Sequence, residues 1–277
     1  MRELSGRTAF ITGGASGIGL ELGRAFAAAG MKVMLADVET GALDQVVTSL
    51  RDIAPDIRGV HCDVADPENV ERAAKATYDA FGHVHVVCNN AGVAAGGGID
   101  NISLDSWRWV IDVNLMGVVH GIRTFLPHLR AHGEGGHIVN TASMAGMNGG
   151  LGFGPYTASK FAVVAMSEGL SMQLKPHGIG VSVLCPSFVR TRIGDSGRNR
   201  PARYGQPQPL DPASPAGQMV AEIARRLEAG LDPSDVAARV VAAIRNDELY
   251  VFTHPNMHDE VDERFAAIQA AMDKVVG

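Results

Sequence analysis

Residues 9–30, AFITGGASGIGLELGRAFAAAG, lead from an apolar, strand-like run through a glycine-rich turn into a segment of helical periodicity. The glycines of the turn are Gly13, Gly14, Gly17 and Gly19. Glycine adopts left-handed backbone conformations and lets a bulky group approach the main chain, while a helix N-terminus offers free N–H groups and a positive dipole. The pattern therefore predicts a strand-to-helix turn that binds an anion, most simply a pyrophosphate. A tight turn without a ligand is the alternative interpretation.

The rest of the chain repeats this order of strand and helix. Apolar, β-branched runs predict strands at 8–12, 32–37, 58–63, 84–90, 136–143, 180–186 and 248–254. Helical periodicity predicts helices near 17–29, 41–51, 67–81, 104–131, 156–175, 216–228, 234–245 and 257–275. Strands this apolar are typical of a parallel sheet covered on both faces. We expect an α/β fold: a doubly wound parallel sheet of about seven strands, with a ligand crevice at the carboxyl ends of the strands.

The length of 277 residues, 46% of them hydrophobic, suits one domain over residues 1–277, since a single domain of this size can still bury one core. Residues 187–215, SFVRTRIGDSGRNRPARYGQPQPLDPASP, show neither periodicity and are dense in proline, glycine and arginine. Loops of this length in compact domains are typically lids or disordered segments, so we expect a substrate lid here. We expect its arginines to contact cofactor phosphates or to be solvated, with an anionic substrate as the alternative: Arg190, Arg192, Arg198, Arg200 and Arg203.

Charge and cysteine usage argue against several classes of protein. The net charge is -6 with acids and bases interspersed, which leaves no basic footprint for nucleic acid or an anionic membrane surface. No apolar run is long enough to span a bilayer, and residues 1–10 lack the layout of a secretory signal, so we expect a cytoplasmic protein. The three cysteines are far apart, and the ten histidines show no HExxH-like spacing. We therefore expect neither a disulfide framework nor a metal site.

Asp37 ends the second predicted strand, eighteen residues after Gly19. A carboxylate at this place in a doubly wound fold can accept hydrogen bonds from an adenosine ribose diol. A 2′-phosphate would instead meet a like charge without compensation, because no basic residue is found among Ala15, Ala36, Val38 and Glu39. The sequence therefore favours NAD over NADP. An aspartate that caps the next helix is the alternative interpretation.

Tyr156 and Lys160 stand four residues apart at the start of a strongly helical segment, so both project from one face. A nearby ammonium stabilises a phenolate, which lets a tyrosine exchange a proton with an alcohol near neutral pH. Ser143, at the end of the fifth predicted strand, is expected in the same crevice and can hydrogen-bond a substrate oxygen. A tyrosine and a lysine at this spacing can also be an ordinary solvated face.

Five features together resemble the short-chain dehydrogenase/reductase family, in order over roughly the first 190 residues: TGGASGIG (12–19), NNAG (89–92), Asn114, Ser143 and YTASK (156–160). The resemblance implies a Rossmann-type fold and hydride transfer between a nicotinamide and a carbonyl or alcohol. By this resemblance Tyr156 is the general acid/base, and Lys160 holds the nicotinamide ribose and lowers the pKa of the tyrosine. Ser143 would polarise the substrate oxygen, and Asn114 would support a water that links Lys160 to solvent.

The resemblance also implies cofactor contacts residue by residue. Asp63 is similar to the family's adenine-ring contact, and Thr191 lies in a segment, PSFVRT, similar to the one that closes over the nicotinamide carboxamide. Ser187 replaces the usual glycine of that segment, which leaves the shape of its turn open. The implied cofactor-binding set is Gly13, Ser16, Gly17, Ile18, Gly19, Asp37, Asp63, Val64, Asn90, Ala91, Gly92, Tyr156, Lys160, Pro186, Val189 and Thr191.

The substrate side is expected among residues that these motifs leave free. Small residues occur at 93–98, and an apolar wall is expected from Met144, Met147, Leu151 and Phe153. His254, Met257 and His258 either overhang the pocket or pack on the last strand. We expect a roomy pocket for a secondary alcohol or ketone with an aromatic or alicyclic body. The alternative is that the methionines merely fill gaps in the core.

Predicted helices 104–131 and 156–175 are apolar around much of their circumference, which is typical of surfaces buried against a partner. This agrees with the family's common tetramer, so we expect a homotetramer or a homodimer. An NADP-dependent carbonyl reductase and a non-catalytic dinucleotide-binding sensor stay open as other functions. The complete set of Asn114, Ser143, Tyr156 and Lys160 favours an enzyme, because a pure binder has no chemical reason to keep it.

Overall fold

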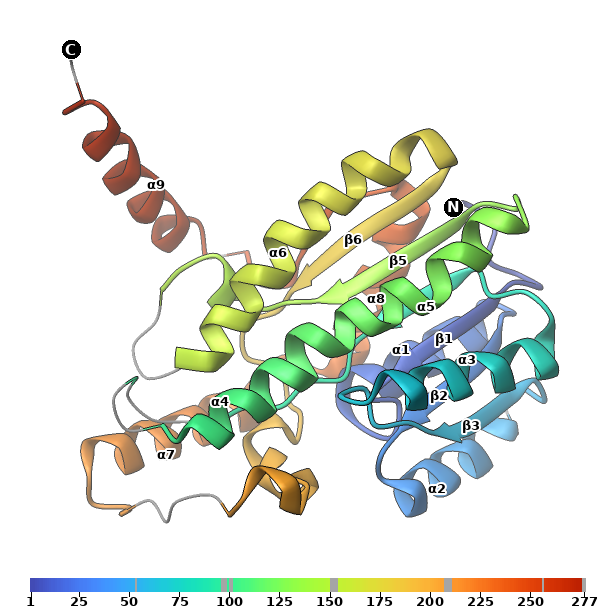
Figure 1. Cartoon of the computed structure of the whole chain (residues 1–277), viewed down its shortest axis with the longest axis horizontal. Helices are drawn as coiled ribbons and strands as arrows, with labels where there is room; N and C mark the ends of the chain where they lie inside the picture. Colours follow the sequence, from blue (N-terminus) through green and yellow to red (C-terminus); the bar gives the residue numbers. More distant parts are fainter. Residues whose placement is uncertain are drawn as a thin grey trace.

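The computed structural model describes residues 1–52, 54–95, 99, 102–149, 154–206, 211–255 and 257–275. Its strands form one parallel sheet in the order β3-β2-β1-β4-β5-β6-β7 (Figure 1). Their bounds are Thr8–Thr12 (β1), Lys32–Asp37 (β2), Ile57–His61 (β3), Val86–Asn89 (β4), Gly136–Thr141 (β5), Ile179–Cys185 (β6) and Tyr250–Phe252 (β7). The strand order reverses between β1 and β4, and a crevice opens at such a point in doubly wound sheets. The predicted fold class is confirmed.

Helices cover both faces of the sheet (Figure 1). One face carries α1 (Gly17–Ala28), α2 (Thr40–Arg51) and α8 (Pro233–Asn246). The other carries α3 (Pro67–Phe81), α4 (Leu104–Ile111), α5 (Gly117–Ala131) and α6 (Gly154–Leu174). Two further helices lie toward the periphery: α7 (Pro215–Glu228) and α9 (His258–Met272), which projects from the body (Figure 1).

The hydrophobic core is divided in two because neighbouring residues of a strand point to opposite faces of the sheet. Ile11 of β1 packs with Leu22 of α1 on one face. Phe10 points to the other face, where its ring centroid lies 4.5 Å from that of Phe125 in α5. Both faces of the sheet are therefore covered mainly by apolar side chains.

The structure differs from the predicted elements in several places, among them the last strand, which is predicted at 248–254 and spans only Tyr250–Phe252. The helix predicted over 104–131 is interrupted by a π-helical turn, Asp112–Met116 (η1). The strand predicted at 84–90 begins only at Val86. The segment predicted as a loop at 187–215 contains two short 3-10 helices, Ile193–Asn199 (η4) and Ala202–Tyr204 (η5), which are too short to show periodicity in the sequence. Residues 207–210 of that segment lie outside the described residues.

A helix that spans a membrane must be both long and apolar. None of the helices in the described part of the chain meets both requirements.

Candidate active site

The glycine turn between β1 and α1 has its shape because of specific glycines. Gly13 and Gly17 have left-handed φ values of 68° and 54°. A Cβ on Gly19 would lie 2.1 Å from the carbonyl oxygen of Gly13, so only glycine lets the helix start this close to the turn. Ser16 holds the N-cap position without a side-chain capping bond to the described backbone, and Ser16, Gly17 and Ile18 line the crevice. The first turn of α1 thus presents its N–H groups to the crevice.

The TGGASGIG and NNAG segments interlock. The Thr12 hydroxyl oxygen accepts hydrogen bonds from the backbone N–H groups of Asn90 (2.9 Å) and Ala91 (3.0 Å). The Asn90 side chain donates in return to the carbonyl oxygen of Thr12 at 2.9 Å. Asn90, Ala91 and Gly92 therefore lie beside the glycine turn and form the floor of the same crevice.

Asp37 stands at the carboxyl end of β2 and is 8% exposed. Its Oδ2 accepts a hydrogen bond from the backbone N–H of Ala15 at 2.9 Å, and its Oδ1 accepts one from Glu39 at 3.0 Å. These bonds hold the carboxylate beside the glycine turn, and each oxygen keeps a lone pair for another donor. The interpretation of Asp37 as a helix cap is wrong, because α2 begins at Thr40 with Glu39 at the N-cap position.

Basic side chains lie near this end of the crevice, although the sequence argument found none among the chain neighbours of Asp37. Glu39 Oε1 accepts hydrogen bonds from Arg198 Nε at 3.1 Å and from Arg198 Nη2 at 2.7 Å. Arg192 Nη1 lies 4.0 Å from Glu39 Oε2. Both arginines reach Glu39 from the 187–215 segment, so a search of neighbouring positions missed them. Glu39 offsets their charge.

The second acidic position is Asp63, which follows β3. Its Oδ1 accepts a hydrogen bond from the backbone N–H of Ala65 at 3.0 Å, and its Oδ2 pairs with Arg203 Nη2 at 2.7 Å. Val64 lines the crevice next to it. Arg198 and Arg203 thus pair with carboxylates of the protein, and half of the Arg203 side chain stays exposed to solvent.

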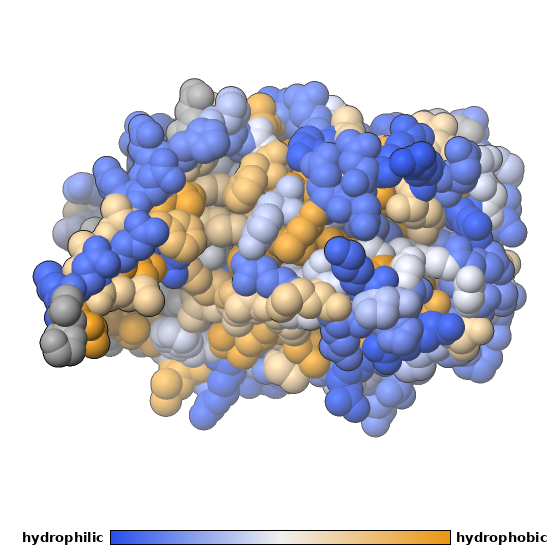
Figure 2. Space-filling model, turned by 90° about the horizontal axis from the view of Figure 1, so that it is seen from above, coloured by the Kyte–Doolittle hydropathy of each residue, from blue (hydrophilic) through white to orange (hydrophobic). Residues whose placement is uncertain are grey.

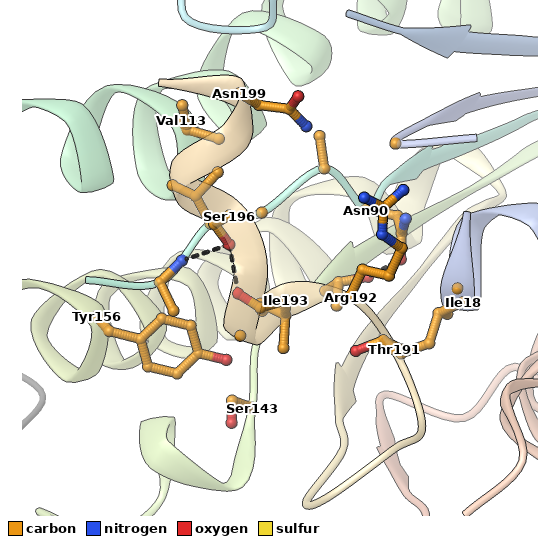
Figure 3. Close-up of a pocket in the computed structure, with 18 of the residues that line it drawn as sticks. Ile18, Asn90, Val113, Ser143, Tyr156, Thr191, Arg192, Ile193, Ser196 and Asn199 are labelled. Atoms are coloured by element: carbon orange, nitrogen blue, oxygen red, sulfur yellow. Dashed lines mark hydrogen bonds between the residues drawn. The ribbon is translucent and has the colours of Figure 1, made fainter. Parts of the chain in front are cut away.

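The catalytic candidates meet where β5 ends and α6 begins. Lys160 Nζ donates a hydrogen bond to the carbonyl oxygen of Thr141 at 2.8 Å and lies 5.5 Å from the centroid of the Tyr156 ring. The Ser143 hydroxyl oxygen accepts a hydrogen bond from the backbone N–H of Ala145 at 3.1 Å. Figure 3 shows the hydroxyl of Tyr156 directed toward Ser143. A substrate oxygen between these two hydroxyls could exchange hydrogen bonds with both.

The pKa values at this site reflect burial. Burial raises the pKa of Tyr156, and the hydrogen bond with Ser143 opposes that rise. Burial also lowers the pKa of Lys160 to about 8. The structure thus differs from the expectation that Lys160 lowers the pKa of the tyrosine, because the ammonium is itself desolvated and donates to Thr141.

Asn114 lies in the π-helical turn η1 and is fully buried. Its Oδ1 accepts a hydrogen bond from the backbone N–H of Val93 at 2.8 Å, and its Nδ2 donates to the carbonyl oxygen of Val93 at 2.9 Å. A Cβ on Gly92 would stand 3.6 Å from Asn114 Oδ1 and 3.7 Å from Lys160 Nζ, so both atoms border the same place. Asn114 therefore fixes the backbone that separates the glycine turn from Lys160.

The segment after β6 closes the other side of the crevice. Pro186, Val189 and Thr191 all line it, and Val189 forms an isolated parallel bridge with Leu231. A Cβ on Gly17 would lie 3.0 Å from Thr191 Cγ2, so Thr191 stands directly against the glycine turn (Figure 3). The crevice has a volume of about 820 Å³ and runs from Asp37 to Tyr156, which is room for a dinucleotide and part of a substrate.

Apart from Asn114 and Gly19, which are buried behind it, the predicted site residues line this one crevice. Met144 and Met257 line it as well, whereas Met147 packs against the core. Leu151, Phe153 and residues 96–98 lie outside the described residues. The sequence reasoning missed a further group of lining side chains: Trp109, Val113, Phe188, Ile193, Ile223 and Leu227. No motif marks them, although Ile223 and Leu227 are spaced to share one face of α7.

One group of possible metal ligands lies away from the crevice. His83, His132 and Glu134 each offer one ligand atom, and these atoms lie within 4.8 Å of one another. Glu134 accepts hydrogen bonds from His83 at 2.8 Å and from His85 at 3.0 Å. The His132 ring is bonded to the carbonyl oxygen of Val84 and to the backbone N–H of Glu134. Hydrogen bonds thus link these three residues to one another and to the backbone of Val84.

Comparison with known proteins gives consistent matches. A family model described as short chain dehydrogenase matches residues 7–201. "C alpha-dehydrogenase" of Sphingobium sp. is 34% identical over 97% of this chain and 87% of its own length. "3-alpha-(or 20-beta)-hydroxysteroid dehydrogenase" of Mycobacterium tuberculosis is 37% identical over 70% of this chain and 73% of its own. The crystal structure of a short chain dehydrogenase/reductase from Burkholderia phymatum in complex with NAD has a TM-score of 0.94 and 40% identity, over 98% and 97% of the two chains.

Proposed function

The chain belongs to the short-chain dehydrogenase/reductase family and is an NAD(P)-dependent oxidoreductase, and from that premise we propose that it uses NAD to interconvert a bulky, mostly apolar secondary alcohol and its ketone. The observation that carries the proposal is the meeting of Ser143 and Tyr156 in a crevice that has Asp37 at its far end. The crevice suits the cofactor, since the start of α1 at Ser16, Gly17 and Ile18 lines it together with the Asp37 carboxylate.

We propose the following roles in the reaction. The glycine turn, Asp37 and Lys160 would hold the dinucleotide, which when bound would supply a hydride acceptor for alcohol oxidation and a hydride donor for ketone reduction. Tyr156 takes the hydroxyl proton in oxidation and gives it back in reduction, which contributes about 10²–10⁴-fold to the rate. Ser143 steadies the charge that develops on the same oxygen. Lys160 orients the ribose, and Asn114 holds the backbone at Val93 in place.

The preference for NAD rests on the acidic end of the crevice. Asp37 and Glu39 both line the crevice there, and the backbone N–H of Glu39 donates a hydrogen bond to the Asp37 carboxylate. A 2′-phosphate on the ribose would place further negative charge next to both. The Burkholderia phymatum structure, 40% identical to this chain, contains NAD, which supports the same choice.

The proposed substrate class rests on the walls near Tyr156. Met144, Ile223 and Leu227 give an apolar surface, and Trp109 adds an aromatic one. Such a surface gains free energy from burying an aromatic or alicyclic body, whereas a polyol would lose hydration there. The name of the Mycobacterium tuberculosis relative, a hydroxysteroid dehydrogenase, is in keeping with a polycyclic substrate.

We also propose a homotetramer or homodimer in the cytoplasm. Apolar side chains gather in a band across the middle of the face shown in Figure 2, and Met172 of α6 is 74% exposed. Faces of this kind are usually covered by a partner. The three free, buried cysteines are in keeping with a reducing compartment. Light scattering on the purified protein tests the assembly, and a monomer at micromolar concentration would contradict it.

The activity is tested by measuring the formation of reduced cofactor with a panel of secondary alcohols: aryl, alicyclic, steroid and polyol. Each alcohol is tested with NAD and with NADP. We expect reduced cofactor to form fastest with NAD and a bulky apolar alcohol. Tyr156→Phe should abolish turnover and still bind NADH, whereas Tyr250→Phe, at an exposed position of β7, should behave as wild type. Faster turnover of polyols would refute the substrate class, and equal loss of turnover in both variants would refute the role of Tyr156.

A further inference from the structure

The segment after β6 spans the crevice and is fixed at its catalytic end. The Ser196 hydroxyl oxygen of η4 accepts a hydrogen bond from the backbone N–H of Ala94 at 3.1 Å and donates one to the carbonyl oxygen of Ile193 (Figure 3). Ser196 is 4% exposed, so this contact is shielded from water. Ile193, one turn earlier in η4, lines the crevice near Tyr156.

The same segment is fixed at the opposite end of the crevice by Glu39. Glu39 Oε1 accepts two hydrogen bonds from Arg198 and a third from Asn199 Nδ2 at 2.8 Å. The side chains of Arg198 and Glu39 are only 20% and 22% exposed. The hydrogen bond from Arg198 is the main reason that the pKa of Glu39 lies below its usual value. This pair is less screened by salt than a fully solvated one.

A second pair repeats the arrangement one strand farther along the sheet. Arg203 of η5 donates to Asp63 Oδ2 at 2.7 Å, and Asp63 is 20% exposed. Its hydrogen bond to Asp63 raises the pKa of Arg203 above the usual value. Glu39 and Asp63 follow β2 and β3, so both carboxylates stand on the rigid sheet, whereas both arginines belong to the segment that crosses the crevice.

Arg192 also approaches Glu39, with its Nη1 4.0 Å from Glu39 Oε2, whereas Arg190 and Arg200 make no such contact across the crevice. Arg190 pairs with Asp232 at the N-terminus of α8. Arg200 donates to the Ser106 hydroxyl and to the carbonyl oxygen of Gly205. Arg198 and Arg203 thus join the segment to the acidic end of the cofactor site through hydrogen bonds, and Arg190 and Arg200 serve as internal comparisons.

We propose that Glu39–Arg198 and Asp63–Arg203 form an ionic latch that holds residues 193–204 across the crevice and controls how fast a nicotinamide dinucleotide leaves it. This inference rests on the proposed function, because it needs a dinucleotide in the crevice. A bound dinucleotide that reaches Asp37 lies under the latch, so its release requires the segment to lift and both ion pairs to break. Glu39 and Arg198 are accordingly positioning residues that act on cofactor residence rather than on proton transfer.

Stopped-flow fluorescence of bound NADH, chased with excess NAD, measures the release rate directly. Glu39→Gln and Arg198→Gln should each accelerate release by about three- to tenfold, as expected for the loss of a partly buried pair. The double variant should release NADH no faster than the faster single one, since both changes remove the same interaction. Arg190→Gln carries the same change of charge in the same segment and should leave the rate unchanged.

Salt and hydrogen exchange give independent readings of the latch. A tenfold rise in salt, from about 0.05 M, should accelerate release from the wild type and have a smaller effect on the double variant. Deuterium exchange of residues 193–204 should rise in Glu39→Gln and Arg198→Gln but not in Arg190→Gln. If these variants bind NADH, and both their release rate and their deuterium exchange equal those of the wild type, the latch is refuted and the proposed function is not. Failure of the wild type to bind either NADH or NADPH overturns the proposed function with it.

Discussion

At Tyr156, burial and a hydrogen bond act on the catalytic hydroxyl in opposite directions. Burial disfavours the phenolate and raises the pKa, whereas the bond with Ser143 favours it. Oxidation of an alcohol needs the phenolate as base, and reduction of a ketone needs the neutral phenol as acid. The two directions of the reaction should therefore respond oppositely to pH.

The first prediction concerns this pH dependence. We expect kcat/KM for alcohol oxidation to increase with pH and kcat/KM for ketone reduction to decrease, in titrations from about pH 6 to 10. Ser143→Ala removes the bond that lowers the pKa of Tyr156, so both profiles should move to higher pH in the residual activity. Profiles that fall together, or that do not move in the variant, would count against Tyr156 as the proton carrier.

The second prediction concerns Asp37. Asp37→Asn keeps the side-chain shape and removes the charge that repels a 2′-phosphate. Hydrogen bonds to charged groups contribute about 1.5–3 kcal/mol, so we expect the ratio of the Kd values for NADPH and NADH to fall by roughly 10- to 100-fold. Calorimetric titration measures both constants, with Asp44→Asn on the exposed part of α2 as the control. An unchanged ratio would show that cofactor choice lies elsewhere.

Among the elements, the turn η1 matters most to the site. The predicted helix over 104–131 is interrupted by Asp112–Met116, and π turns of this kind often occur at functional sites. The interruption turns Asn114 toward Val93, where its amide pairs with both the N–H and the carbonyl group of one residue. A regular helix would offer no such match to the strand-end backbone.

The third prediction tests that role. Asn114→Ala leaves the buried N–H and carbonyl groups of Val93 without these partners, and each unsatisfied group costs about 1–3 kcal/mol. We expect a lower Tm and a lower kcat, with the Kd for NADH less affected. Val110→Ala, also fully buried next to η1, is the matched control and should lower Tm without a comparable loss of kcat. Equal losses of kcat in Asn114→Ala and Val110→Ala would show that Asn114 contributes only to the stability of the core.

The elements that could be predicted from sequence are those with local signals. The apolar run of β1 and the glycines at Gly13 and Gly17 predict a strand, a turn and a helix, because each depends on neighbouring residues alone. The pair of Tyr156 and Lys160 was visible for the same reason, at helical spacing. The Glu39–Arg198 pair joins positions 159 residues apart, so only the folded chain reveals it. The π turn η1 has no sequence periodicity distinct from that of an α-helix, so the sequence predicts one uninterrupted helix there.

At the scale of the whole molecule, a second network of hydrogen bonds and ion pairs lies at the amino ends of the strands, opposite the crevice. Glu134, after α5, accepts hydrogen bonds from His83 and His85, which precede β4, and pairs with Arg7 before β1. The hydrogen bonds from His85 and His83 lower the pKa of Glu134 to about 2. The network thus ties the beginnings of neighbouring strands together through one carboxylate.

The fourth prediction follows from that depressed pKa. The ionised Glu134 is favoured in the folded state, so its stabilisation is present above the unfolded value of about 4.3 and is lost as pH falls toward 2. We expect Glu134→Gln to lower Tm at pH near 5, and the gap from the wild type to narrow as pH falls to about 3. Asp79→Asn, at the exposed Lys75–Asp79 pair, is the control. A gap that stays constant with pH would assign the loss to packing.

The most direct test of the proposed function follows the hydride itself. A secondary alcohol labelled with deuterium at the carbinol carbon is incubated with the protein and NAD, and the reduced cofactor is analysed by mass spectrometry. Our account predicts NADH that carries the label with the wild type and no labelled NADH with Tyr156→Phe, although that variant still binds NADH. Reduced cofactor without the label, or label transfer that persists without the Tyr156 hydroxyl, would contradict it.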